Sequence, residues 1–477
     1  MNWILPILMF LLVHCSLTAQ QWSDPIVVSS TIGFNMDSDF VIDNENNIHV
    51  VWNYKVEDNF WKVFYSVSYD GGNSWSEAVD LLENNSQWMS QPHIASDSEN
   101  NLYVTYDHDT GNPSQMMVYM IKNLDGVWIS PEIVSTDMFG SSYNQIIIDA
   151  DDRLYIFWKN NSRSFYKYYE DSCWSEIQSP YEPNNLITSL SLDSQNNLHC
   201  CGGNWTSSPD KIKLSYYYYD KAGDLWASPE ILTSSFIEVD QDIGVDNFGN
   251  PHLTWRERDQ IPIPENDFTL YQFYNGMNWT EKEIVVEDPW EQQIAIDQNN
   301  GAHIVDREKL PVGWQLVHHR KIEDQWVSCL VDSSEVVVAR PEIICCNDKL
   351  YLTYDKTWDS GVNGFISDIF ISSFDIQTGL EPSYINLPID LSIYPNPSND
   401  VINIDFLVNE DCFVNLYIFS LNGGLVVQLE NSNLSSGNYH YQWDGCNNDG
   451  SKLKSGLYLC RLQQGKTIIT RSIQITN

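Results

Sequence analysis

Apolar and polar residues alternate in short stretches along most of this chain, which is the pattern of half-buried β-strands. Repeatedly, an apolar run ends in Asp, a polar turn follows, and a second run contains His or Tyr, as in VIDNENNIHVVW at residues 41–52. Seven such hairpins follow one another, the last at residues 341–355. In six of them we expect an Asp to accept the backbone hydrogen bonds of the turn, and these are Asp43, Asp97, Asp149, Asp193, Asp246 and Asp297.

A tryptophan opens a further short strand in each repeat, and the series is Trp22, Trp75, Trp128, Trp174, Trp226, Trp279 and Trp326. A strand-rich repeat of about fifty residues is typical of a β-propeller blade. The last hairpin has no such tryptophan after it, whereas Trp22 precedes the first hairpin. We therefore expect the N-terminal strand to complete blade seven and to cover an otherwise open sheet edge.

The pattern changes after a linker at residues 376–390. From residue 391 to 477, alternating apolar residues separated by Gly and Asn turns predict a small Ig-like β-sandwich. The predicted fold class is therefore all-β, with a seven-bladed β-propeller at residues 20–375 followed by this small domain.

The N-terminus carries the features of an export signal. Residues 3–13 are apolar but too few to span a bilayer, and cleavage is expected after Ala19, so that residues 1–19 are a signal peptide. The formal net charge of −40 disfavours nucleic acid and anionic membranes as partners. We expect a protein that is secreted or held on the outer cell surface, with no membrane span in the mature chain.

Cysteine usage gives no metal or disulfide pattern. Of the ten cysteines, Cys15 lies in the signal, and the nine that remain cannot all pair within one chain. Neighbouring strand residues point to opposite faces, so Cys200 and Cys201 are expected to fill the core. No CxxC or Cys/His spacing indicates zinc, and neither a metal nor a cofactor is predicted.

Residues 68–75, SYDGGNSW, match the Asp-box S-x-D-x-G-x-x-W through Ser68, Asp70, Gly72 and Trp75. Through this motif the chain resembles the sialidase-like propellers of the bacterial neuraminidase repeat family. The resemblance implies that the Asp-box is a structural turn on the face away from the active site. Asp70 is accordingly expected to serve the fold.

The C-terminal segment is similar to the type A sorting domain of the type IX secretion system. The similarity rests on Tyr394, Pro395, Asn396, Pro397, Trp443, Asp444, Gly445, Asp449, Gly450, Gly456 and Tyr458. It implies export through the type IX machinery, which would be a partner of this domain. Whether the domain is then removed stays open.

Internal repetition separates scaffold positions from candidate site positions. His49, His199, His252 and His303 occupy one repeated position, which predicts core histidines. Four residues before each turn Asp stands a polar residue that varies between repeats, and the series is Asp39, His93, Gln145, Ser189, Asp242 and Gln293. In a propeller, the first strand of each blade begins at the same face of the disc at which the second strand ends. We therefore expect a binding site on that face.

Charged residues follow the second strands on this predicted face. Arg256 and Arg307, joined by Arg340, would form an anion site suited to a carboxylate or sulfate. Candidate acid–base groups are Asp107, His108 and Asp109 in the loop after the second strand of repeat two, together with Asp39, His93 and Asp242. Alternatively, the charges solvate loop ends and pair with Glu257 and Glu308. Loop tryptophans expected to stack on sugar rings are Trp88, Trp205, Trp290, Trp314 and Trp358.

A true sialidase is not predicted. Such an enzyme needs three arginines for the sugar carboxylate, but the first Arg of this chain, Arg153, falls in a turn on the opposite face, and no Arg-Ile-Pro motif is present. The leading hypothesis is an exported propeller that binds a glycan or another extracellular macromolecule without turnover. The alternatives are a glycan-cleaving enzyme, either polysaccharide lyase or glycoside hydrolase, with catalytic residues unassigned, and a structural surface protein without a ligand.

Overall fold

The computed structural model describes residues 22–476 with the exception of residues 32, 58–59, 83–87, 110–115, 137–139, 161–162, 182–184, 206–211, 234–237, 259–266, 288, 311, 323–324, 360–364, 377–390, 397, 399–400, 409–411, 421–424, 448–449 and 465–466. The predicted signal peptide and nearly all of the predicted linker lie outside the described residues. Within the described part the regular elements are all β-strands, so no helix there could cross a membrane.

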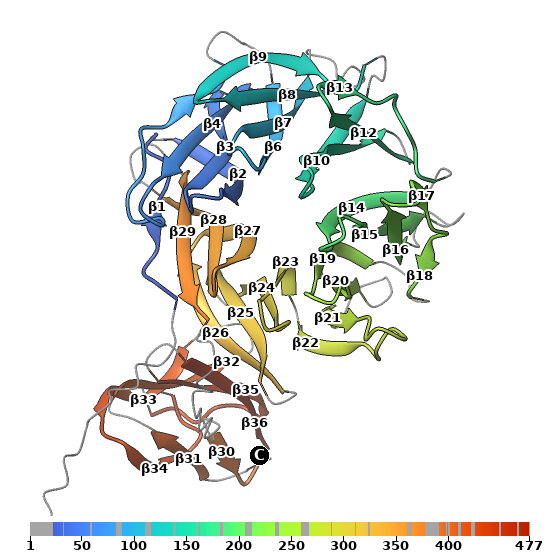
Figure 1. Ribbon diagram of the computed structural model, residues 1–477. Coiled ribbons are helices and arrows are strands. Elements are labelled where there is room, and N and C mark those ends of the chain that lie inside the picture. Colours follow the sequence, from blue (N-terminus) through green and yellow to red (C-terminus); the bar gives the residue numbers. More distant parts are fainter. Residues whose placement is uncertain are drawn as a thin grey trace, which may run out of the picture.

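Five consecutive sheets account for residues 88–334, and Figure 1 shows them placed around a central axis like the blades of a propeller. Their strands are β6 (Trp88–Ser96), β7 (Leu102–Asp109), β8 (Met117–Leu124) and β9 (Val127–Ile133); β10 (Ser141–Ile148), β11 (Leu154–Asn160), β12 (Arg163–Glu170) and β13 (Cys173–Trp174); β14 (Asn185–Leu192), β15 (Leu198–Trp205), β16 (Ile212–Asp220), β17 (Leu225–Trp226) and β18 (Glu230–Ile231); β19 (Glu238–Val245), β20 (Pro251–Arg258), β21 (Asp267–Phe273) and β22 (Glu283–Glu287); and β23 (Pro289–Ile296), β24 (Ala302–Lys309), β25 (Trp314–Ile322) and β26 (Gln325–Ser334). The predicted all-β propeller is confirmed.

One eight-stranded sheet contains the first and the last repeat. Its strands are β1 (Ile26–Val27), β2 (Phe34–Ile42), β3 (Ile48–Glu57), β4 (Phe60–Ser68), β5 (Val79–Asp80), β27 (Val337–Cys346), β28 (Lys349–Asp359) and β29 (Phe365–Asp375). The two repeats meet through a single parallel pair, Phe34 with Ser367. Strand β1 pairs antiparallel with β29, so the N-terminal strand lies on the last strand of the ring.

In the four repeats that have one, the repeated histidine lies against the turn Asp of its own repeat. In the first repeat, Asp43 accepts from the backbone N–H groups of Glu45 and Asn47, and its second oxygen lies 3.0 Å from Nε2 of His49. Nδ1 of His49 lies 2.8 Å from the hydroxyl of Tyr65. His199 and His252 each make the same contact with a tyrosine hydroxyl. The prediction that these are core histidines is confirmed.

The repeated tryptophans join neighbouring sheets. Four of them pack edge-on against a tyrosine of the preceding repeat, in the pairs Trp128 with Tyr65, Trp226 with Tyr166, Trp279 with Tyr216 and Trp326 with Tyr271. Trp22 makes the equivalent contact with His318, which occupies the tyrosine position of the sixth repeat. The apolar core therefore lies between sheets, and the periodic tryptophans are part of it.

Neighbouring cysteines fill the cores on the two sides of one strand. Cys200 packs with Leu198 and Tyr217, whereas Cys201 packs with Leu214 and Trp255. Both are fully buried. The expectation that this pair fills the core is confirmed.

Residues from 391 onward form two facing sheets. One contains β30 (Leu391–Tyr394), β31 (Ile402–Val408) and β34 (Gly437–Trp443), and the other contains β33 (Leu425–Leu434), β32 (Cys412–Ser420), β35 (Gly456–Gln464) and β36 (Thr467–Ile475). Burial alternates strictly along β31, and its inward residues share one core with residues of the opposite sheet such as Leu416 and Leu462. This is the predicted small β-sandwich.

Candidate functional site

Every innermost strand of the propeller has a β-bulge at the same place. The register slips between Met36 and Asp39 in β2, and it slips at the corresponding point of β6, β10, β14, β19, β23 and β27. A bulge leaves extra residues unpaired on one strand and turns their side chains in a new direction. The first extra residues are Asp37, Gln91, Tyr143, Thr188, Asp240, Glu291 and Arg340.

Six of these bulges place a side-chain-bearing residue in the left-handed region. The φ angles at Asp37, Gln91, Tyr143, Asp240, Glu291 and Arg340 lie between 49° and 54°. Each costs on the order of 1 kcal/mol or more, since a Cβ crowds the backbone there, and such strain clusters at functional sites. Because six repeats have this strained backbone at the same position, we infer that the surrounding structure holds it in place.

The bulges together line a cavity of about 560 Å³. All seven first bulge residues contribute to its wall, so it is built from every innermost strand. Amide side chains form much of the remaining lining, among them Gln145, Gln241, Gln292 and Gln293. The volume falls in the range of small-molecule sites, and the polar groups converge from different strands.

The residues that the sequence placed just after the second strands lie within these strands instead, because the strands are longer than predicted, and they stand opposite the bulges. Asp107 accepts from the backbone N–H of Tyr143 and from the amide of Asn144, both in the bulge of the next repeat. Asn53 donates to Asp37 in its own repeat. The predicted shared face of strand starts and strand ends is therefore present.

The three predicted anion contacts are each paired with an acid. Nη2 of Arg256 lies 2.8 Å from Oδ2 of Asp240, and Nη2 of Arg307 lies 3.2 Å from Oε1 of Glu291. Arg340 alone of the three lines the cavity. The acids that pair with Arg256 and Arg307 are therefore not the predicted Glu257 and Glu308. Glu257 pairs with Lys282, and Glu308 accepts a hydrogen bond from Gln315.

Arg340 is placed between two carboxylates. Its Nε lies 2.6 Å from Oδ1 of Asp37 and its Nη1 lies 2.9 Å from Oδ2 of Asp355. Burial raises the pKa of Asp355 to about 7 even though the charge of Arg340 opposes that shift. The arginine therefore partly neutralises a carboxyl that the fold has removed from water.

Aromatic rings cover the other two guanidinium groups. Arg256 lies 4.6 Å from the ring centroid of Trp290, and Arg307 lies 4.3 Å from that of Trp314. Trp290 is 39% exposed and so presents a surface to solvent, although it and Trp314 lie in strands β23 and β25 and not in the predicted loops. The ion pairs and rings together make Arg256 and Arg307 supports of the bulges at this face.

Of the predicted acid–base residues whose side chains are described, His93 alone lines the cavity, and its Nδ1 lies 3.1 Å from Oδ2 of Asp39. Although burial opposes it, this hydrogen bond raises the pKa of His93. Asp242 is buried and accepts from Ser189 and from the backbone of Ile294.

Asp107 and His108 lie away from the cavity lining. Burial raises the pKa of Asp107 to about 7. His108 is buried against Tyr119, with ring centroids 4.8 Å apart. The side chains of Trp88 and Trp205 lie outside the described part of the structure, as does that of Asp109.

Glu342 is a titratable residue of the cavity wall that the sequence interpretation missed, as it missed the bulge residues. It stands in β27 at the place of Asp39 and Asp242 in their strands, opposite Thr353. Burial, together with the charges of Asp39 and Asp242, raises the pKa of Glu342 well above its ordinary value. The seventh turn begins with Cys346 in place of Asp, so counting back from a turn Asp could not find it. Alignment of this hairpin, EIICCNDKLYLTY, with the other six would have identified its first residue, Glu342, as the equivalent position.

Residues 392–476 match the family model of the secretion system C-terminal sorting domain. The predicted C-terminal sorting domain is confirmed. A sorting domain of this kind supports export by the type IX machinery to the outside of the cell. No curated protein matches the chain in sequence.

Solved structures resemble the propeller part at low identity. A polysaccharide lyase, a PL25 ulvan lyase, aligns with a TM-score of 0.52 at 10% identity over 73% of this chain and 93% of its own. An α-L-arabinanase from Penicillium chrysogenum aligns at 0.41 and 11% identity over 60% and 94%. The NanB sialidase from Streptococcus pneumoniae aligns at 0.40 and 12% identity over 75% and 70%. At such identities the lyase likeness shows the propeller fold alone.

Proposed function

We propose that this exported propeller binds a saccharide in the cavity formed by the seven bulges. The observation that carries the proposal is the cavity wall, where amide and carboxyl groups from six of the seven innermost strands, with Thr188 from the seventh, converge on about 560 Å³. Planar amides donate and accept hydrogen bonds at once, which suits the paired donor and acceptor character of sugar hydroxyls. The sorting domain supports delivery of this cavity to the cell exterior, where glycans are abundant.

The charge pattern favours a neutral saccharide over an acidic one. Asp37, Asp240 and Glu291 are paired with arginines, whereas Glu342 faces the cavity beside two further carboxyl groups. Arg340 in the wall is already paired with Asp37 and Asp355, so a uronate or sulfate would have to compete with these carboxylates. Arg256 and Arg307 as anion contacts for an acidic glycan therefore have less support than the sequence pattern gave them.

A binding panel tests the proposal. The full mature chain would be titrated with neutral, uronate-containing, sialylated and sulfated oligosaccharides. Gln293→Ala, in the cavity wall, should weaken binding of the bound sugar about three- to tenfold, the effect of losing one neutral hydrogen bond. Gln298→Ala provides the matched control, because Gln298 is exposed in the turn after Asp297. Equal effects of both changes, or no binding to any glycan, would contradict the proposal.

A glycan-cleaving activity is the second candidate, and Glu342 is the observation that favours it. A carboxyl whose pKa is raised by burial and by a neighbouring carboxyl is the kind of group that supplies a proton to a leaving group. Glu342→Gln should then abolish product release and leave binding within about threefold. Retained turnover in this variant would exclude Glu342 as the acid.

A further inference from the structure

Opposite each bulge, the second strand of the repeat has one residue that is in most repeats a buried aromatic residue. In five repeats it is Trp52, Tyr106, Trp158, Trp255 or Tyr354, each at most 1% exposed. The fourth repeat has Gly202, where a Cβ would stand 1.8 Å from the carbonyl oxygen of Leu186. Close backbone approach thus explains the glycine.

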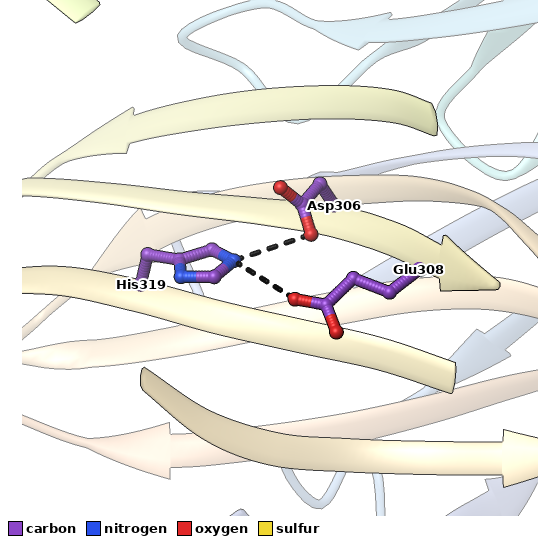
Figure 2. A group of neighbouring side chains, drawn as sticks. All are labelled: Asp306, Glu308 and His319. Carbon is purple, nitrogen blue, oxygen red and sulfur yellow. Dashed lines mark hydrogen bonds and ion pairs between the residues drawn. The ribbon is translucent and has the colours of Figure 1, made fainter. Parts of the chain in front are cut away.

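In the sixth repeat the residue opposite the bulge is neither aromatic nor glycine. It is Asp306, which is 0% exposed. A carboxylate in the place of an aromatic core residue is costly unless it is paired or binds a metal. Figure 2 shows Asp306 with two neighbouring side chains, Glu308 and His319. Asp306 and Glu308 stand two residues apart on β24 and so project from the same face, and His319 projects beside them from β25.

The three side chains converge on one point. Nε2 of His319 lies 3.2 Å from Oδ1 of Asp306 and 3.9 Å from Oε1 of Glu308. One ligand atom from each residue falls within 4.8 Å of the other two. Ligands bound tetrahedrally at about 2.1 Å stand roughly 3.4 Å apart, so small adjustments would allow all three to share one ion.

A second set of residues holds the outer atom of each side chain. The hydroxyl of Thr269 donates to Oδ2 of Asp306 at 3.2 Å, and Nε2 of Gln315 donates to Oε2 of Glu308 at 2.7 Å. Nδ1 of His319 lies 2.8 Å from the hydroxyl of Ser328. Metal ligands are characteristically oriented in this manner, with the second atom of each ligand bonded elsewhere.

We infer that Asp306, Glu308 and His319 form a binding site for a divalent transition metal, with zinc as the best-fitting ion. An imidazole among the ligands favours zinc over calcium or magnesium, which prefer all-oxygen sites. Coordination through Nε2 requires neutral His319, and the two ligating carboxylates then carry two negative charges, which a dication neutralises. Three protein ligands leave a fourth position for water, and the 23% exposure of the Glu308 side chain provides a route from solvent.

Zinc binding to the full mature chain, purified without a metal-binding tag and stripped with chelator, tests the inference. Titration calorimetry should give one zinc ion per chain, and Co²⁺ in its place should show the visible absorption of a tetrahedral site. Glu308→Gln should weaken zinc binding about tenfold or more. The matched control is Glu257→Gln, which alters the corresponding glutamate of the fifth repeat, where Lys282 is the partner.

His319→Gln and Asp306→Asn should remove both the zinc and the cobalt signals. If either buried variant fails to fold, the comparison of Glu308→Gln with Glu257→Gln decides, since both residues reach solvent in part. Stoichiometric zinc that Glu308→Gln weakens and Glu257→Gln does not would support the site. Absence of zinc binding in the wild-type chain, or equal loss in the two glutamate variants, would show that the three residues form only a buried hydrogen-bonded cluster.

Discussion

Arg340 and Asp37 form an ion pair between the last and the first innermost strands of the propeller, with Nε and Oδ1 2.6 Å apart. Both are first residues of a bulge and both have positive φ. Arg340 also holds Asp355, a carboxyl that is 1% exposed. One side chain therefore couples the closure of the ring to the shape of the cavity and to a buried acid.

Arg340→Gln should destabilise the protein more at pH 8 than at pH 5. The pKa of Asp355 is raised to about 7 in the folded chain, so the native state holds the proton more tightly than the unfolded state, and the free energy of unfolding falls as pH rises from about 4 to about 7. Loss of the arginine raises this pKa further and enlarges the fall. We expect a loss on the order of 1–3 kcal/mol at pH 8, measured by urea unfolding. A loss of equal size at both pH values would contradict this account, and Arg340→Gln in an Asp355→Asn background should lack the pH dependence.

The N-terminal segment should be essential for the stability of the propeller. Trp22 is 4% exposed and packs on Phe374 and His318, while the backbone of Ser23 bonds to Ser373. Trp22→Ala should cost about 3–5 kcal/mol, the range for a large buried aromatic residue. Deletion of residues 21–30 should abolish cooperative melting, whereas a deletion of equal length in the linker should not. An unchanged melting temperature after the N-terminal deletion would refute the predicted closure.

The sequence predicted the fold well because the propeller repeats itself. Alternation, turn Asp residues and periodic tryptophans each recur, so an error in one repeat is corrected by the others. Asp43 with His49 could be assigned to the scaffold for this reason. The same repetition concealed the site, because a bulge depends on strand register, and the sequence around Asp37 or Glu291 does not reveal a slip of register.

Charged residues were the least predictable part of the candidate site. The sequence placed Arg256 and Arg307 on the correct face, but their partners Asp240 and Glu291 reach them only because a positive φ turns each acid toward its arginine. The cluster at Asp306 was equally hidden, since His319 approaches it from a neighbouring strand. Side-chain pairing across strands is a consequence of register and not of spacing in the chain.

The C-terminal domain should carry the export address. A reporter fused to residues 1–19 and to residues 391–477 should leave a cell that has a type IX secretion system, whereas the same reporter without the C-terminal residues should stay in the periplasm. The reason is that the sandwich matches a sorting domain and has its own closed core. Immunoblots of medium and periplasm measure the outcome, and equal release of both fusions would be the contrary result.

Arg307→Ala should lower stability and leave saccharide affinity nearly unchanged. The guanidinium pairs with Glu291, whose left-handed backbone forms part of the cavity wall, and it packs on Trp314. Removing the guanidinium leaves Glu291 without this partner and exposes the ring of Trp314. We therefore expect the free energy of unfolding, measured with urea, to fall by about 1–2 kcal/mol. Lys309→Ala removes a more exposed cation near the same ring and should change stability by less than about 0.5 kcal/mol. If Arg307→Ala instead kept full stability and weakened an acidic glycan tenfold or more, the arginine would be a ligand contact, and the cavity would be a site for acidic sugars after all.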